Sequence, residues 1–150
     1  MFVCTQNLCR SHMAEVLFEN WLERHNVPGG WKVISSGTWV QEGAVLTADI
    51  LDALKQTGID LADHDCQSIT PELLAASDLV LCMTRFHKEA LQAEFPSHAS
   101  RIKILSEMAG ARFDVKDVTG ITVDECLRVA GELIKLIDAA GAHIVRLLQG

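Results

Sequence analysis

Apolar residues form two kinds of pattern along this chain. In short stretches nearly every residue is apolar, or every second one is, which is typical of strands in a buried parallel sheet. In longer stretches an apolar residue recurs every three or four positions, which is typical of amphipathic helices. The predicted strands cover residues 1–3, 31–35, 78–83 and 101–105. The predicted helices cover residues 11–26, 47–57, 70–74 and 84–95, together with a final helix that begins after Thr122.

Residues that begin or end helices flank these stretches. The Val-Pro-Gly-Gly sequence at 27–30 ends the first helix, Gly58 ends the second and Pro96 ends the fourth. Thr122 with Glu125 forms a capping box at the start of the final helix. We expect the buried stripe of that helix to consist of Leu127, Ala130, Ile134, Ile137, Ile144 and Leu148.

The order of these elements predicts the fold class. Strands that alternate with helices indicate an α/β fold, in which a parallel sheet carries helices on both faces. No repeat, linker or low-complexity stretch divides the chain, so we expect a single domain over residues 1–150. Open sheets of this kind bind ligands at the carboxyl ends of their strands. Cys4 directly follows the first predicted strand, which places it at that edge.

Composition and charge narrow the function further. The 150 residues are 49% hydrophobic and 22% charged, as in ordinary globular proteins. The net charge of −7 argues against binding to nucleic acid or to anionic membranes. No apolar run approaches the roughly 18 residues that span a bilayer, so we expect a cytoplasmic protein that does not bind membranes.

The cysteines and histidines indicate neither a disulfide framework nor a metal site. Five cysteines at irregular spacing favour reduced thiols. No His and Cys residues show the close pairing of a zinc site, and we expect no cofactor.

The segment from Cys4 to Ser11 carries the chemistry. A loop between a strand and a helix directs its backbone N–H groups at one point, and the helix dipole favours an anion there. Helix N-termini and a nearby Arg favour ionisation of a thiol, which makes Cys4 a candidate nucleophile. Arg10 supplies a planar fork that binds two phosphate oxygens at once. Cys, five residues, Arg and Ser together are the signature of cysteine-dependent phosphatases.

The full string at residues 3–11, Val-Cys-Thr-Gln-Asn-Leu-Cys-Arg-Ser, is followed by Met-Ala-Glu at 13–15. It resembles the low-molecular-weight protein tyrosine phosphatases and their relatives, the thioredoxin-coupled arsenate reductases. The resemblance covers essentially the whole chain and implies a four-stranded parallel sheet. It also implies a phosphocysteine intermediate on Cys4, phosphate binding by Arg10, and donation by Ser11 to the Cys4 sulfur. The rest of the binding loop would be Thr5, Gln6, Asn7, Leu8 and Cys9.

Transfer of a phosphoryl group to Cys4 also needs an acid for the leaving oxygen. Alone, Asp114 and Asp117 would be interpreted as solvated loop carboxylates. The resembling family takes its acid from the Asp of an Asp-Pro pair in this loop, with another Asp three residues earlier. The resemblance therefore assigns the general acid to Asp117.

Further residues are expected to support the loop. By resemblance, Asn7, Ser35 and His64 form a hydrogen-bonded set that holds the loop from behind, although His64 is equally well interpreted as an exposed histidine. Trp39 is either a wall of the substrate pocket or a partly buried surface residue. Cys9 is expected to form a reversible disulfide with Cys4, as is thought for the family.

The chain departs from the family pattern at four positions, and a fifth bears on the choice of substrate. Val118 replaces the usual Pro after the acid, and Thr119 replaces an aromatic residue that flanks a phosphotyrosine ring. Gln6 replaces a usual Gly, which would strain the backbone if φ were positive there. His12 replaces a usual Pro. Leu8 stands where the subgroup acting on phosphoarginine carries Thr, which disfavours that substrate.

Three functions follow from these observations. The first is a phosphomonoesterase acting on phosphotyrosine in a protein or on a small phosphomonoester. The second is an arsenate reductase, which needs two further redox cysteines after the third strand. The third is a non-catalytic domain that binds phosphate or phosphopeptides. Inorganic phosphate or sulfate is expected to fit the loop in each case, and we expect a monomer or a weak dimer. Only three residues precede Cys4, so either the first strand is short or further residues precede Met1.

Overall fold

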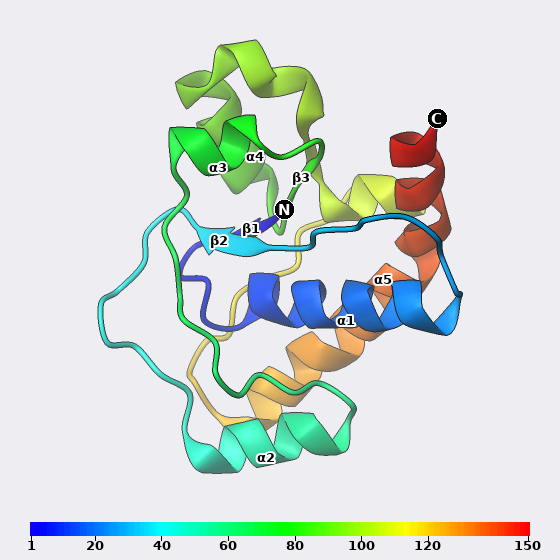
Figure 1. The fold of residues 1–150 in the computed structure, drawn as a ribbon. Helices are drawn as coiled ribbons and strands as arrows, with labels where there is room; N and C mark the ends of the chain where they lie inside the picture. Colours follow the sequence, from blue (N-terminus) through cyan, green and yellow to red (C-terminus); the bar gives the residue numbers. More distant parts are fainter.

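A four-stranded parallel sheet forms the centre of the protein in the computed structural model, which describes residues 1–150 (Figure 1). The strands are β1 (Phe2–Cys4), β2 (Ser35–Gly37), β3 (Val80–Cys82) and β4 (Ile102–Ile104). Their order in the sheet is β2-β1-β3-β4. The two central strands, β1 and β3, are in register through Val3 and Cys82. The expected α/β class with a four-stranded parallel sheet is confirmed.

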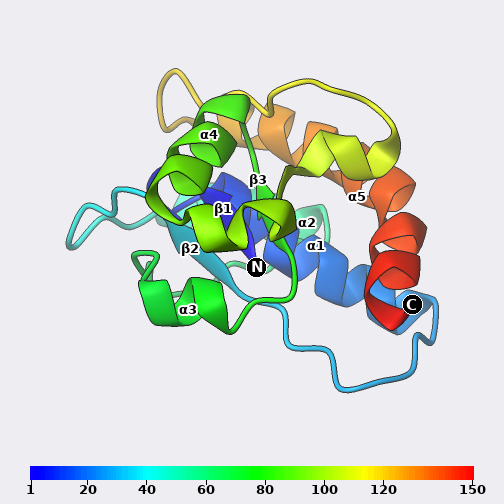
Figure 2. The same cartoon turned by 90° about the horizontal axis from the view of Figure 1, so that it is seen from above.

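Five α-helices and two short 3₁₀ helices surround the sheet. The helices are α1 (Arg10–Arg24), α2 (Ala48–Gln56), α3 (Pro71–Ala75), α4 (Arg85–Glu94), α5 (Val123–Gln149), η1 (Pro96–Arg101) and η2 (Leu105–Ala109). Thr84 and Thr122 cap α4 and α5, since each side chain accepts a hydrogen bond from the third helical N–H. Figure 2 shows the long connection between η2 and α5 passing the start of α4. No helix combines the length and apolar character needed to cross a bilayer.

The strands bury alternate residues on the two faces of the sheet, as a period of two requires. On one face Val3 and Val80 pack with Leu74 of α3 and Leu91 of α4. On the other face Phe2, Cys4 and Leu81 belong to the larger core with α1 and α5. In Figure 1 α3 and α4 lie above the sheet, while α1 and α5 lie below it. Helices therefore cover both faces of β1.

Two predicted elements differ from the structure. The second strand was expected at residues 31–35 but lies at Ser35–Gly37, because β1 pairs Phe2 with Ser35. The apolar residues Trp31 and Val33 pack against the larger core instead of entering the sheet. The loop expected at 106–121 begins with the helical turn η2.

The buried face of α5 is rotated from the expected stripe. Leu127 and Ile134 are half-buried and Leu148 is exposed. The buried residues of α5 are Cys126, Val129, Ala130, Leu133, Leu136, Ile137, Ala140, Gly141 and Ile144. Gly141 sets this face, since a Cβ there would lie 2.4 Å from a ring carbon of Trp21 on α1. Close packing of a helix on a Trp ring requires a small residue, which a hydrophobic pattern does not signal.

Candidate active site

The site is built on residues 5–9, which connect the end of β1 to the start of α1. Backbone hydrogen bonds from Thr38 N to Cys4 O (3.0 Å) and from Trp39 N to Thr5 O (2.8 Å) extend the pairing of β1 and β2 into this loop. Gly37 permits the close approach, because a Cβ there would lie 2.5 Å from Thr5 O. The loop is therefore fixed from the β2 side before it curls toward α1.

The Cys4 sulfur lies inside the curl of this loop. Its Sγ accepts a hydrogen bond from Asn7 N at 3.3 Å and lies 3.0 Å from Ser11 Oγ. Ser11 Oγ itself accepts a hydrogen bond from Asn7 Nδ2 at 2.8 Å, so its own proton is available to the sulfur or to Ser36 O. Donors arranged in this way stabilise a thiolate. The structure thus brings Cys4, Asn7 and Ser11 together as the sequence predicted.

Asn7 holds the loop in shape. It is fully buried, and its φ of 56° lies in the left-handed region that Asn tolerates better than most residues. Its Nδ2 donates to Ser35 Oγ at 2.9 Å, and its Oδ1 accepts from Gln67 N at 3.0 Å. Its backbone oxygen accepts from His64 Nε2 at 2.9 Å. Ser35 and His64 therefore lie where the resemblance placed them. Gln6 has no positive φ, so the strain considered for it is absent.

Arg10 links the phosphate loop to the segment that precedes α5 and carries Val115 and Asp117. The residue is 3% exposed, and its guanidinium donates to Val115 O at 2.8 Å. A second guanidinium nitrogen lies 3.3 Å from a carboxylate oxygen of Asp117. Val115 is in turn bonded to the end of β3, through Val115 N to Met83 O at 2.9 Å. The sheet therefore positions both Arg10 and the segment that carries Asp117.

The two aspartates of this segment have different surroundings. Asp114 Oδ1 accepts a hydrogen bond from Arg85 N at 2.8 Å, at the start of α4. Asp117 is 55% exposed and faces Arg10 at the mouth of the loop. Of the two, Asp117 is therefore in the position from which a carboxyl group can reach a ligand above Cys4.

A pocket of about 180 Å³ opens between the loop and this segment. It is lined by Cys4, Gln6, Leu8, Cys9, Arg10, Leu46, Asp117, Val118, Thr119, Gly120, Ile121 and Cys126. The lining combines Arg10 with four aliphatic side chains, Leu8, Leu46, Val118 and Ile121. Trp39, which was considered as a wall, is not among these residues and is 63% exposed. Apart from Asp117, no acidic side chain lines the pocket.

Sequence reasoning missed His87, which supports the loop from α4. The residue is 3% exposed, and its Nε2 lies 2.8 Å from Thr5 Oγ1 while its Nδ1 lies 2.9 Å from Thr84 Oγ1. Burial, and to a smaller extent Arg10, lower the pKa of His87 to about 4, so the ring is neutral at pH 7. The sequence shows only that His87 is the third residue after Thr84, which caps α4. Its contact with Thr5 joins residues 82 positions apart and has no local pattern.

Two of the other thiols, Cys9 and Cys82, have raised pKa values, which disfavours their ionisation. The hydrogen bond to Cys126 and burial raise the pKa of Cys9 well above its usual range. Burial raises the pKa of Cys82 to about 12. All five cysteines are free, and the expected Cys4–Cys9 disulfide stays a prediction.

His12 is buried near the start of α1, and its ring stacks on His64 with a centroid distance of 3.3 Å. Burial and the neighbouring His64 lower the pKa of His12 to about 3.

Together the fold and the loop define a class of protein: an α/β domain in which a buried thiol and an Arg lie at the two ends of a loop suited to a tetrahedral oxyanion. The family model for low molecular weight phosphotyrosine protein phosphatase matches residues 1–135.

Individual relatives agree with this match. A protein-arginine-phosphatase of Bacillus subtilis (strain 168) is 34% identical over 138 residues, which are 91% of this chain and 90% of the relative. The crystal structure of a low molecular weight protein tyrosine phosphatase from T. tengcongensis is 36% identical, with a TM-score of 0.81 over 92% of this chain and 93% of that one. A YwlE arginine phosphatase variant with a phosphorylated active-site serine is 32% identical, with a TM-score of 0.83 over 99% of this chain and 93% of that one.

The chain belongs to the low molecular weight phosphotyrosine protein phosphatase family. It is accordingly a protein phosphatase, a hydrolase acting on phosphorylated substrates.

Proposed function

We propose that the protein hydrolyses phosphomonoesters through a phosphocysteine on Cys4. The Cys4 thiolate attacks phosphorus while the bond from phosphorus to the ester oxygen breaks, and Asp117 gives its proton to that oxygen. Asp117, now a carboxylate, then takes a proton from the water that attacks the phosphocysteine. The bond between phosphorus and sulfur breaks, inorganic phosphate forms, and Ser11 donates to the departing sulfur.

The observation that carries this proposal is that one pocket holds both a candidate nucleophile, Cys4, and a candidate general acid, Asp117. Cys4 Sγ is surrounded by donors, with Asn7 N at 3.3 Å and Ser11 Oγ at 3.0 Å, while Asp117 stands at the mouth beside Arg10. A module that only binds phosphate needs the donors but neither a nucleophile nor an acid. The related arginine phosphatase variant with a phosphorylated active-site serine supports phosphoryl transfer to an active-site side chain.

The pocket walls favour an aryl phosphate as substrate. Leu8, Leu46, Val118 and Ile121 offer apolar surface to a flat ring above the phosphate. Phosphoarginine carries a guanidinium group, and Asp117 would be the one carboxylate on the lining to receive it. We therefore place phosphotyrosine first and phosphoarginine second, although a protein-arginine-phosphatase is among the relatives.

Arsenate reduction is less compatible with the remaining cysteines. Cys82 is fully buried within β3, and Cys126 is 1% exposed on α5 beside Cys9. A disulfide cascade requires thiols that can move to meet the oxidised one. Cys82 is held in a central strand of the sheet, and Cys126, although it lines the Cys4 pocket, is held on the helix α5.

The test compares variants on substrates with different leaving groups. Asp117→Asn should lower kcat by about 10² to 10⁴ with phosphotyrosine, because the tyrosine oxygen needs its proton. The loss should be smaller with p-nitrophenyl phosphate, whose leaving group is more acidic. Asp124→Asn, at an exposed site in the first turn of α5, is the matched control and should leave both rates unchanged.

Two outcomes would oppose the proposal. An equal loss on both substrates would remove Asp117 as the acid. A kcat/KM for phosphoarginine above that for phosphotyrosine would reverse the order of substrates while leaving the phosphocysteine mechanism intact.

A further inference from the structure

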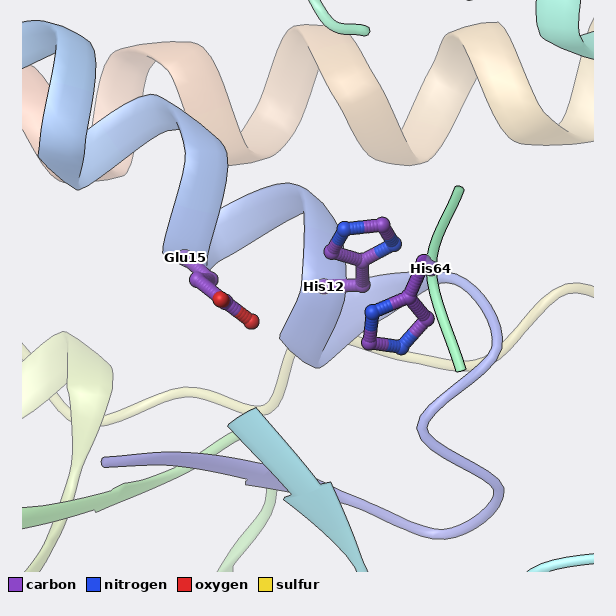
Figure 3. A group of neighbouring side chains, drawn as sticks. All are labelled: His12, Glu15 and His64. Carbon is purple, nitrogen blue, oxygen red and sulfur yellow. The ribbon is translucent and has the colours of Figure 1, made fainter. Parts of the chain in front are cut away.

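A group of metal-binding side chains lies beneath the phosphate loop, outside the pocket that holds Cys4. His12 and Glu15 come from α1, three residues apart and thus on one face of the helix, and His64 comes from the segment between α2 and α3. One ligand atom from each lies within 4.8 Å of the others. Figure 3 shows the Glu15 carboxylate directed toward the space beside the two stacked rings.

The hydrogen bonds of this group leave ligand atoms free. His64 Nε2 donates to Asn7 O, since a carbonyl only accepts, and therefore the Nδ1 lone pair of His64 is free. A metal-binding histidine usually holds its other N–H against a carbonyl in this way. The His12 ring makes no hydrogen bond to the protein although the residue is 7% exposed. One Glu15 oxygen accepts from Ser35 Oγ, which leaves the other oxygen unoccupied.

The surroundings of these three side chains favour a cation and are open to solvent. His12 and His64 also line a solvent-open pocket of about 360 Å³, together with Asp63 and Asp65. These two carboxylates make the approach negative, which attracts a divalent ion. Two imidazoles and a carboxylate are a donor set of Zn²⁺, with a fourth position for water.

We propose that His12, Glu15 and His64 form a binding site for a divalent transition-metal ion of the Zn²⁺ type. Bonds of about 2.0 to 2.2 Å place tetrahedral ligand atoms about 3.4 Å apart. Metal binding therefore requires the longest distances between the three ligand atoms to shorten by up to about 1.4 Å. Rotation of the Glu15 side chain and of the two rings can supply this movement. No local sequence pattern indicates the site, because His64 is far along the chain from His12.

The site is connected to the phosphate loop at two points. His64 bonds to the backbone oxygen of Asn7, and Glu15 bonds through Ser35 to the Asn7 side chain. A bound ion fixes His64 and Glu15, and through them it stabilises the left-handed turn at Asn7. The ion itself takes no part in phosphoryl transfer.

The experiment titrates the full chain with Co²⁺, whose visible absorption reports nitrogen and oxygen ligands and whose near-ultraviolet charge-transfer band reports thiolate. Wild type should show the visible bands without the thiolate band, and Zn²⁺ should displace Co²⁺ and raise the melting temperature. Glu15→Gln, which keeps the shape of the side chain, should weaken Co²⁺ binding about tenfold or more, and His12→Ala should do the same. Circular dichroism of the metal-free variants verifies that each is folded.

Two variants are matched controls for this titration. Glu19→Gln, one turn further along α1 and exposed, should bind Co²⁺ as wild type does. Cys4→Ser should also retain the visible bands. The proposal is overturned if wild type binds no Co²⁺, if folded Glu15→Gln binds it unchanged, or if the signal carries a thiolate band and is lost in Cys4→Ser. None of these outcomes depends on phosphatase activity.

Discussion

Replacing Asn7 with Ala tests how much of the phosphate loop is held by one side chain. The Asn7 side chain makes three hydrogen bonds, to Ser11 Oγ, Ser35 Oγ and Gln67 N. Each contributes about 0.5 to 1.5 kcal/mol, so their loss destabilises the fold by about 3 kcal/mol. Ala is also less tolerant than Asn of the φ of 56°, which costs about 1 kcal/mol more. We expect a total near 4 kcal/mol, a large fraction of the 5–15 kcal/mol that is typical for folded domains.

Urea unfolding measures this loss, and Asn26→Ala separates its two parts. Asn26 has a φ of 50° but is exposed and makes no side-chain hydrogen bond, so its substitution should cost about 1 kcal/mol. Relaxation of the loop should also move Asn7 N away from Cys4 and lower kcat about 100-fold. The reasoning is refuted if Asn7→Ala is no more destabilising than Asn26→Ala and keeps the wild-type kcat.

Two further predictions concern packing and pH. Gly141→Ala should destabilise the protein by about 1 to 3 kcal/mol in urea unfolding, as in other overpacked cores, because its Cβ would lie 2.4 Å from the Trp21 ring. Gly131→Ala on the same helix meets open space and should stabilise it by about 0.5 to 1 kcal/mol; equal effects would contradict the packing argument. His87 has its pKa lowered to about 4, so the unfolded chain binds a proton near pH 6.5 before the folded one does. The contribution of His87 to stability should be constant above pH 6.5 and fall by about 3 kcal/mol down to pH 4. His87→Gln should remove this contribution and leave a similar loss due to His12, whose pKa is lowered to about 3; an unchanged slope would exclude His87 as a source.

Sequence reasoning succeeded where the information is local. The strand, loop and helix around Cys4 are adjacent in the chain, and a Thr before a helix satisfies a helical N–H wherever the helix lies. The pairing of Asn7 with Ser35 and His64 was expected through family resemblance, because residues so far apart show no local pattern.

The misses come from tertiary contacts. The second strand was misplaced because the register with β1, and not the apolar character of residues 31–35, decides which residues enter the sheet. His87 was missed because its partner Thr5 is brought to it by the pairing of β1 with β3. The stacking of His12 on His64 likewise depends on how the segment after α2 returns to α1.

The measurement that tests the central claim most directly is rapid-quench mass spectrometry during turnover of p-nitrophenyl phosphate. We expect one phosphoryl group on the peptide that contains Cys4 in wild type. It should accumulate in Asp117→Asn, because p-nitrophenolate leaves with little help from an acid, whereas hydrolysis of the phosphocysteine loses its base. Cys66→Ser, which removes a half-buried thiol bonded to Asn7 O, should still form this intermediate. Steady hydrolysis by Cys4→Ser at the wild-type rate, with no phosphoryl group on residue 4, would contradict the account.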